Sequence, residues 1–272
     1  MMKINFIQLL FLIFCSFGCQ STKKLTTSKA VPQISITGSQ FYKTVAGVTR
    51  EERENRAVSE ILQGNMPAFL KKMHRINVSI FDSVHQKTIH AHYFVTPDYL
   101  SIGSNTDFAR IPLTPMSAQR IADSLHCFLP TRKIVNDIYN QAKIKPEPQP
   151  MYAFRDSAPT FFHHHLIIEG QRRLQKGLIA GIKKDVVISD KISRDARPNR
   201  VAIYGWHKLD GKPIQPLYTG HVNWYVDYSH GIRLVHRTIY VEDKAMDYRT
   251  VLQDPILKNL ICDEVFCDMY RY

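Results

Sequence analysis

Hydrophobic and polar positions repeat along this chain with two different periods, and the period predicts the kind of element that each stretch forms. Apolar residues three or four positions apart predict a helix over 49–62, where Thr49 and Glu52 match the pattern of a capping box. Strict alternation over 76–80 and near alternation over 88–95 predict the two strands of a hairpin. The first part of the chain is therefore expected to combine helices with an antiparallel strand pair.

Shorter elements are predicted for the rest of the chain. The expected elements are helices over 114–125 and 130–139, and strands over 98–103, 178–181, 185–188, 201–204 and 232–235. A last helix over 246–261 contains Pro255, which divides it into two short pieces. Helices and strands segregate along the chain instead of alternating. This order predicts an α+β fold with a mixed or antiparallel sheet and flanking helices.

The first residues carry the features of an export signal. Lys3 precedes an apolar run over 6–14, and small residues lead to Cys19. The run is shorter than the ~20 apolar residues that a membrane-spanning helix needs. A small residue directly before a cysteine resembles the lipobox of bacterial lipoproteins. The resemblance implies cleavage before Cys19, a diacylglycerol on its sulfur, and an exported protein anchored to a membrane on the periplasmic side or at the cell surface. The alternative is an ordinary secreted protein cut near the same place.

These patterns divide the chain into successive parts. The predicted parts are a signal peptide over 1–18, a lipidated tether over 19–35, an N-terminal α+β part over 36–145, and a C-terminal part over 151–272 with a mixed sheet and a candidate pocket. The proline-rich stretch between the last two parts predicts a stiff, extended connector. If that connector is not a boundary, residues 36–272 form one continuous domain.

Composition and charge narrow the range of partners. A hydrophobic content of 44% with 22% charged residues is typical of a folded globular protein. The formal net charge is +12, and basic residues are densest over 172–200. Such a surface favours anionic polymers outside the cytoplasm, such as lipid headgroups, acidic glycans or peptidoglycan carboxylates, although a solvated basic loop is an equal alternative. Nucleic acid is not expected, given the export signal, and no phosphate-binding glycine loop or dinucleotide fingerprint is present.

Three cysteines follow Cys19, and an odd number leaves at least one free thiol within a single chain. Cys262 and Cys267 are close enough in sequence to bridge in an oxidising compartment. Cys127 lies in an apolar stretch and is predicted to be a small buried hydrophobe.

Residues with chemical potential gather over 201–237. This segment contains both tryptophans of the chain and four of its twelve histidines, with turn residues between them. Titratable groups on loops next to aromatic side chains are what a binding pocket needs. The candidate acid–base or metal-binding residues are His207, His221, Asp227 and His230. The candidate substrate contacts are Tyr204, Trp206, Gln215, Tyr218, Trp224, Tyr228 and Arg233.

Three interpretations of these histidines compete. Imidazole and carboxylate ligands suit zinc, which makes zinc the one cofactor to consider, but the spacing matches no zinc signature. A regular strand over 225–232 would also place Asp227 and His230 on opposite faces, unless a kink at 229–231 brings them together. The second interpretation is acid–base or hydrogen-bonding histidines that hold a polar substrate. The third is a turn with structurally satisfied histidines. The separate run His163–His165 is predicted to lie on the surface.

The six residues Ser229–Leu234 are similar to the Ser-His-Gly-Cys-Ile-Arg-Leu signature of bacterial L,D-transpeptidases, which cross-link peptidoglycan through that cysteine. The family also places a histidine upstream, a role that His207 or His221 matches in position. Here Ile232 directly follows Gly231, so the nucleophilic thiol is missing and that chemistry cannot run. The resemblance implies a divergent relative that still recognises wall peptides. The wider segment also resembles an uncharacterised group of exported bacterial proteins.

Two functions are therefore expected from the sequence. The first is an exported lipoprotein that hydrolyses a cell-envelope polymer, peptidoglycan or a related glycan or peptide, through a His/Asp pocket. The alternative is a non-catalytic lipoprotein that binds an anionic polymer at the surface or in the periplasm. Convergence of His221, Asp227 and His230 within hydrogen-bond reach would favour the enzyme.

Overall fold

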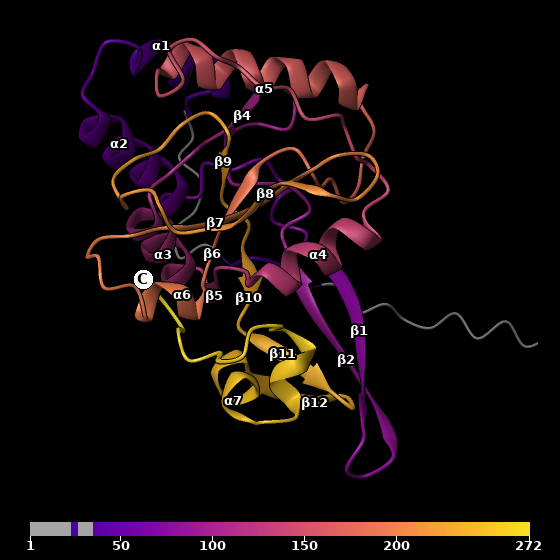
Figure 1. Cartoon of the computed structure of the whole chain (residues 1–272). Coiled ribbons are helices and arrows are strands. Elements are labelled where there is room, and N and C mark those ends of the chain that lie inside the picture. The colour runs from indigo at the N-terminus through magenta and orange to yellow at the C-terminus, as the bar shows by residue number, and fades with distance from the viewer. Residues whose placement is uncertain (1–22, 27–34) are drawn as a thin grey trace, which may run out of the picture.

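The computed structural model describes residues 23–26 and 35–272 of the chain (Figure 1). The predicted signal peptide and the lipidation site Cys19 lie outside the described residues. Within the described ranges, no helix is both long and apolar enough to cross a membrane.

Helices and strands are both abundant in the described part, which confirms the predicted α+β class. The helices are α1 (Gly38–Thr44), α2 (Arg50–Leu62), α3 (Pro115–Ser124), α4 (Arg132–Gln141), α5 (Ala158–Arg172), α6 (Asp190–Ser193), α7 (Tyr248–Gln253) and the 3₁₀ turn η1 (Leu257–Leu260). The strands are β1 (His74–Asp82), β2 (Lys87–Val95), β3 (Ser101–Gly103), β4 (Phe108–Arg110), β5 (Cys127–Phe128), β6 (Lys184–Val187), β7 (Ala202–His207), β8 (Pro213–Tyr218), β9 (His230–Gly231), β10 (Val235–His236), β11 (Thr238–Val241) and β12 (Lys244–Asp247).

Hydroxyl side chains begin most of the longer helices, as the sequence predicts. Thr49, Thr114 and Thr131 each stand before a helix, and each side chain accepts a hydrogen bond from the backbone N–H three residues further on. Ser157 does the same for α5. Each cap satisfies one of the N–H groups that a helix leaves unpaired at its start, which is why the predicted helix starts agree with the observed ones.

The larger sheet joins strands from both halves of the chain. Its order is β12-β11-β2-β10-β5, with β1 paired to β2, and all of its pairs are antiparallel. The predicted hairpin is confirmed as β1–β2, which extends well beyond the body of the molecule (Figure 1). Strand β10 lies between β2 and β5, so a residue pair such as Val235 and Phe128 connects parts that are far apart in sequence.

The smaller sheet has the order β8-β7-β6-β9 and carries most of the candidate site. Strands β6, β7 and β8 pair antiparallel, whereas the two-residue strand β9 runs parallel to β6. A separate antiparallel pair is formed by β3 and β4. One large buried apolar cluster includes side chains from both sides of the proline-rich stretch, among them Ile61, Phe94, Phe161 and Val235. The site is thus built on a framework that both halves share.

Several elements differ from the sequence-based prediction. No strand forms over 178–181, where Ile179 makes only an isolated bridge to Ile144. Helix α5 was not predicted, and the expectation that His163–His165 lie on the surface is wrong for two of the three: His164 and His165 are buried, while His163 is exposed. Helix α5 packs over the body of the molecule, and its apolar residues do not form the single stripe that periodicity detects (Figure 1).

The prediction that Cys127 is buried is confirmed, and the pairing of Cys262 with Cys267, which the sequence left open, is resolved. Cys262 and Cys267 form a disulfide that closes a short loop near the C-terminus, and Cys127 is a buried free thiol. Residues 23–26, which belong to the predicted tether, contact the domain: the Leu25 N–H donates to the carbonyl of Lys71 at 2.9 Å, and the Leu25 side chain is buried.

Candidate functional site

A tight turn over 227–230 brings Asp227 and His230 together. The Asp227 carboxylate accepts hydrogen bonds at Oδ1 from the Ser229 N–H at 2.9 Å and from the Ser229 hydroxyl at 2.5 Å. The His230 N–H donates to the Asp227 carbonyl at 3.1 Å. An aspartate that accepts from the residue two positions on is a common way to form a turn. The turn supplies the kink that places both side chains on one side.

The second carboxylate oxygen of Asp227 is also fully engaged. Arg155 Nη2 donates to Oδ2 at 2.8 Å, and the Tyr225 hydroxyl donates to the same atom at 3.2 Å. Burial alone would raise the pKa of Asp227, but the nearby His230 and the hydrogen bonds from Ser229 outweigh burial and lower the pKa to about 2. Asp227 is therefore a buried, fully charged carboxylate at neutral pH.

His230 is held in one orientation with one ring nitrogen unpaired. Its Nδ1 lies 3.4 Å from the Asp227 N–H, which makes Nδ1 the acceptor and leaves the proton of the neutral ring on Nε2. That Nε2 is buried and has no hydrogen-bond partner among the described residues. Burial lowers the pKa of His230 to about 4, against the opposing effect of Asp227. His230 is thus a neutral donor without an acceptor, a rare condition for a buried polar group.

His221 and Tyr225 surround the His230 ring. The centroid of the His221 ring lies 6.3 Å from that of His230 and 4.9 Å from that of Tyr225, and Tyr225 lies 6.0 Å from His230. His221 is half-buried, and burial, together with Lys184, lowers its pKa. Three of the four predicted acid–base residues therefore lie near one another, but only Asp227 and His230 are within hydrogen-bond reach, and His221 contacts His230 through its ring alone. The imidazole of His221 is the most accessible of the three side chains.

Two consecutive lysines adjoin the turn over 227–230: Lys183, directly before β6, and Lys184, the first residue of β6. Lys183 is buried, its Nζ lies 3.0 Å from Nδ1 of His164, and it donates to the carbonyl of Tyr228. Burial lowers the pKa of Lys183 to about 7. Lys184 lies beside Trp206, with its Nζ 5.4 Å from the ring centroid, and burial lowers its pKa as well. Part of the basic segment over 172–200 is therefore interior.

The fourth predicted residue, His207, lies elsewhere. Its Nε2 is 3.2 Å from the side-chain oxygen of Asn136, and its ring stacks on Tyr139 with centroids 4.4 Å apart. Tyr204 contacts the same asparagine at 2.8 Å. Both side chains thus face α4, whereas Trp206 faces Tyr228 and Lys184. An irregularity in β7, where the pairing with β8 shifts register between Ile203 and Gly205 and Trp206 has a φ of +54°, interrupts the alternation and places His207 on the side of Tyr204, away from the other candidates.

Arg233 is placed in the interior and not at a surface. Its guanidinium donates to the carbonyls of Thr96 and Ile179 at 2.9 and 2.7 Å and lies 4.3 Å from the ring centroid of Tyr99. The side chain is fully buried. In this position Arg233 binds the backbone of neighbouring segments, and a substrate carboxylate has no path to it.

The remaining predicted contacts fall into two groups. Trp206 and Tyr228 are buried, and the Tyr228 hydroxyl accepts from the Met151 N–H at 2.7 Å. Tyr218 and Trp224 are exposed, and the Tyr218 ring lies 5.3 Å from that of His221. Gln215 is half-buried on the edge strand β8, with its amide bonded to the next residue's carbonyl. Only the exposed group is available to a ligand.

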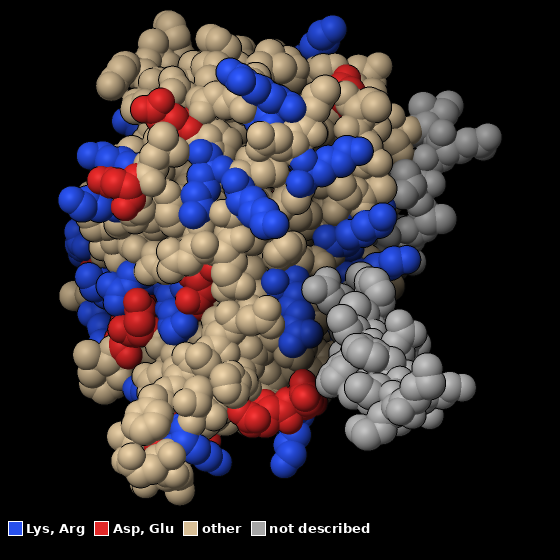
Figure 2. All heavy atoms as spheres, turned by 90° about the vertical axis from the view of Figure 1, so that its right-hand side faces the viewer, with Lys and Arg blue, Asp and Glu red and all other residues tan. Residues whose placement is uncertain are grey.

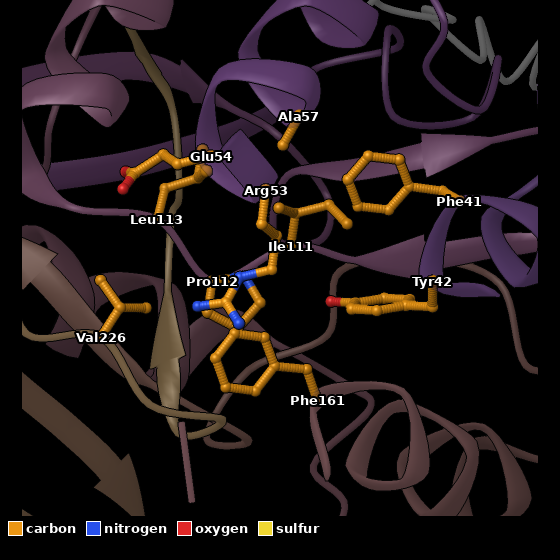
Figure 3. A pocket seen from close by; sticks show the side chains of 10 residues that line it. All are labelled: Phe41, Tyr42, Arg53, Glu54, Ala57, Ile111, Pro112, Leu113, Phe161 and Val226. Atoms are coloured by element: carbon orange, nitrogen blue, oxygen red, sulfur yellow. The ribbon is translucent and has the colours of Figure 1, made fainter. Parts of the chain in front are cut away.

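A small cavity lies behind the turn. It measures about 10 Å³, the room of one water molecule, and Val226, Arg53 and Tyr42 are among its lining residues. Figure 3 shows the Arg53 guanidinium beside the ring of Phe161, with Val226 and Tyr42 on opposite sides. The guanidinium carbon is 4.6 Å from that ring centroid. Packing of Val226 at this wall fixes the segment that leads into Asp227.

Zinc is not supported by the arrangement of side chains. Nowhere in residues 23–26 and 35–272 do three or more histidine, cysteine or acidic side chains gather in a way that could hold a metal ion. The Asp227 carboxylate is occupied by four hydrogen bonds, and His207 is on the other face of the sheet. We therefore derive no step through a metal.

The sequence did not reveal four members of this site. They are Arg155, Lys183, Lys184 and Tyr225. Arg155 lies more than seventy positions before Asp227, in the loop that precedes α5, and no local pattern connects the two. The lysines belong to the basic segment already noted, but only the parallel pairing of Lys184 with His230 shows that they adjoin the turn.

Comparison with known proteins finds no matching family model, no related curated protein and no similar solved structure. Function is therefore argued from the site itself.

Proposed function

We propose that this protein is an exported, membrane-anchored lipoprotein that hydrolyses an anionic polymer of the cell envelope, peptidoglycan or a related glycan or peptide. The observation that carries the proposal is His230, a buried neutral imidazole held by Asp227 whose Nε2–H lacks an acceptor and lies next to His221. An oriented donor without a partner, beside a second imidazole, is what a hydrolytic site requires.

His230, Lys184 and His221 have different roles in the proposed hydrolysis. The mechanism applies to an amide or ester bond of the polymer, since a glycosidic bond has no carbonyl group. The Nε2–H of His230 donates to the carbonyl oxygen of that bond and stabilises the negative charge that develops there, and Lys184 adds positive charge nearby. His221 is neutral at pH 7, because its pKa is lowered, and it takes a proton from the attacking water. The water oxygen bonds to the carbonyl carbon, the bond to the leaving group breaks, and His221 returns the proton to that leaving group.

Ser229 is not the nucleophile in this proposal. Its hydroxyl is buried and already donates to Asp227. It serves instead to hold the Asp227 carboxylate in the turn, and the backbone N–H of Asp227 positions the His230 ring. Water is therefore the attacking group.

The alternative is a non-catalytic lipoprotein that binds an anionic polymer. Two observations favour it. His230 is only 2% exposed. Lys and Arg side chains also cover the face that carries the β1–β2 hairpin, whereas Asp and Glu are fewer there (Figure 2). Such a surface attracts polyanions whether or not a reaction follows.

One experiment separates the two functions. The purified protein is incubated with peptidoglycan, with and without added zinc, and released fragments are identified by mass spectrometry. Hydrolysis predicts new fragments that disappear in His221→Ala and His230→Ala but persist in His163→Ala, which removes an exposed histidine of α5. Co-sedimentation with the wall but no fragments from any form would support the binding lipoprotein. If the protein neither releases fragments nor co-sediments, peptidoglycan is not its ligand.

The anchor is tested separately. Expression of the full chain in a bacterial host with radiolabelled palmitate is expected to label the wild type and not Cys19→Ser. Labelling of both forms, or of neither, would refute lipidation at Cys19.

A further inference from the structure

Exposed aromatic side chains lie in the two segments next to the turn over 227–230. Tyr152 and Phe154 are 89% and 81% exposed in the loop before α5, and Trp224 and Tyr218 are 56% and 44% exposed in the segment that carries His221. Solvent-exposed aromatic rings in such a group are unusual for a protein surface without a partner. We call these four side chains the aromatic rim.

Hydrogen bonds and ring contacts join the two sides of the aromatic rim. The Met151 N–H donates to the Tyr228 hydroxyl at 2.7 Å, and the Tyr228 N–H donates to the Arg155 carbonyl at 2.9 Å, so the loop before α5 lies along the 227–230 turn. On the other side, the Tyr218 ring contacts His221, which contacts Tyr225. Arg155 and Tyr225 meet at the same carboxylate oxygen of Asp227, which connects the two sides through the site.

The backbone of Phe154 is strained, and its ring is exposed. Its φ is +47°, in the left-handed region that a bulky side chain rarely adopts. Strain of this kind persists only where the surrounding structure maintains it, and it concentrates at functional segments. Phe154 directly precedes Arg155, whose salt bridge to the buried Asp227 holds the loop in place.

The charges of the site call for an anionic ligand. Arg155 and Lys184 lie beside the carboxylate of Asp227, and Arg50 pairs with Asp156, so basic side chains outnumber acidic ones at the site. The Arg155 side chain is 44% exposed and retains donors that can form a bidentate pair with a carboxylate. A ligand that also packs against aromatic faces needs positively polarised C–H groups, which one side of a pyranose ring presents.

The neighbouring sheet edge disfavours a peptide. Strand β8 is the outer strand of the smaller sheet, and an extended peptide would have to pair with it to use the backbone for binding. Pro213 and Pro216 lie in that strand and remove two N–H donors. A glycan needs no such pairing.

We propose that the aromatic rim, with Arg155 at its centre, binds a carboxylate-bearing polysaccharide. The rings stack on sugar faces, and Arg155 pairs with a uronate-type or lactyl carboxylate. The inference rests on the proposed function for the location of the polymer in the envelope, but binding is independent of whether the bond is then hydrolysed.

Binding of the full chain is measured by calorimetry with three probes: polygalacturonate, which is a carboxylated glycan, dextran, which is a neutral glycan, and poly-glutamate, which is a carboxylated peptide. Binding is expected for polygalacturonate alone. Phe154→Ala is expected to weaken it about tenfold, the effect of truncating one good anchor. Phe81→Ala, which removes another exposed phenylalanine ring (63% exposed) at the hairpin, is the control and is expected to leave it unchanged. Arg155→Lys retains the charge but not the bidentate pair and is expected to weaken binding.

Three outcomes overturn the inference: equal binding of poly-glutamate, equal binding of dextran, or the same affinity in Phe154→Ala and Phe81→Ala. If the protein does not hydrolyse peptidoglycan but still binds polygalacturonate through Phe154, the hydrolase fails and this inference stands. If hydrolysis depends on His230 but binding does not depend on the aromatic rim, only this inference fails. Circular dichroism of each variant shows whether it is folded.

Discussion

Replacing His230 by glutamine should remove a specific part of the acid sensitivity of this protein. The ring is buried and neutral, and Asp227, Lys184, His221 and Lys183 are the titratable groups around it. Glutamine retains an amide donor of similar size but does not titrate. The comparison therefore concerns how the free energy of unfolding changes with pH and not its value at a single pH.

The magnitude follows from the shift in pKa. His230 has a pKa of about 4 in the folded protein, compared with 6.5 as the reference value. As the pH falls below 6.5, the unfolded chain binds a proton that the folded chain does not, so stability is lost until the pH reaches the folded pKa. The full difference is about 3 kcal/mol, at roughly 1.36 kcal/mol per pKa unit, and about 2 kcal/mol of it falls between pH 7 and pH 5.

Urea denaturation at pH 7, 6 and 5 measures the effect. Wild type is expected to lose about 2 kcal/mol more than His230→Gln between pH 7 and pH 5. His207→Gln should behave in the same way, because burial lowers the pKa of His207 to about 4 as well. His163→Gln is the exposed control and should follow the wild type. Parallel stability profiles for wild type and His230→Gln would refute the argument that His230 is buried in its neutral form.

Three further predictions concern the framework of the site. A Cβ at Gly231 would come within 2.5 Å of the Tyr99 ring, so Gly231→Ala should lower the free energy of unfolding by roughly 1–3 kcal/mol. Gly170 lies in helix α5, and a Cβ there would have no other atom within 4 Å. Gly170→Ala should therefore raise the free energy of unfolding by about 0.5–1 kcal/mol. A Cys262→Ser/Cys267→Ser double variant should lose about 2 kcal/mol, the expectation for so short a loop, and a larger loss in chemical denaturation would contradict it. Phe154→Gly should raise the melting temperature while weakening glycan binding, because glycine relieves the positive φ, and a lower melting temperature would show that the ring stabilises the loop.

The sequence predicted the elements whose signals are local. Threonine caps at residues 49, 114 and 131 mark helix starts by a mechanism that acts within three residues, and the alternation of the β1–β2 hairpin has a period of two. Helix α5 has the same kind of cap in Ser157, but it was not predicted because its buried positions include histidines and do not follow one stripe. The strand predicted at 178–181 does not form, because a short apolar run indicates that a segment is buried but does not specify its secondary structure.

The sequence predicted only those residues of the site that come from one short segment of the chain. His221, Asp227 and His230 lie within ten positions of one another, and a turn is sufficient to bring them together. His207 is also near in sequence, but the backbone irregularity at Gly205 and Trp206 in β7 turns it toward α4. Arg155 joins the cluster only because the loop before α5 packs along the turn, and such a tertiary contact leaves no trace in a local pattern.

Because neighbouring side chains cover His230, a ligand can reach its ring only if one of them moves. Because this ring is almost inaccessible and lies within about 6 Å of both His221 and Tyr225, a group that reaches its Nε2 must displace one of these two rings. The Tyr225 hydroxyl is bound to Asp227, whereas the ring of His221 has contacts only with the aromatic rings of Tyr218, Tyr225 and His230 among those described. His221 is therefore the ring expected to move. Its replacement by glycine should open the path to His230, so that binding of a small carboxylate such as acetate, followed through the His230 resonances by NMR, becomes stronger while hydrolysis is lost. Unchanged resonances in the glycine variant would show that Tyr225 is the ring that closes the site.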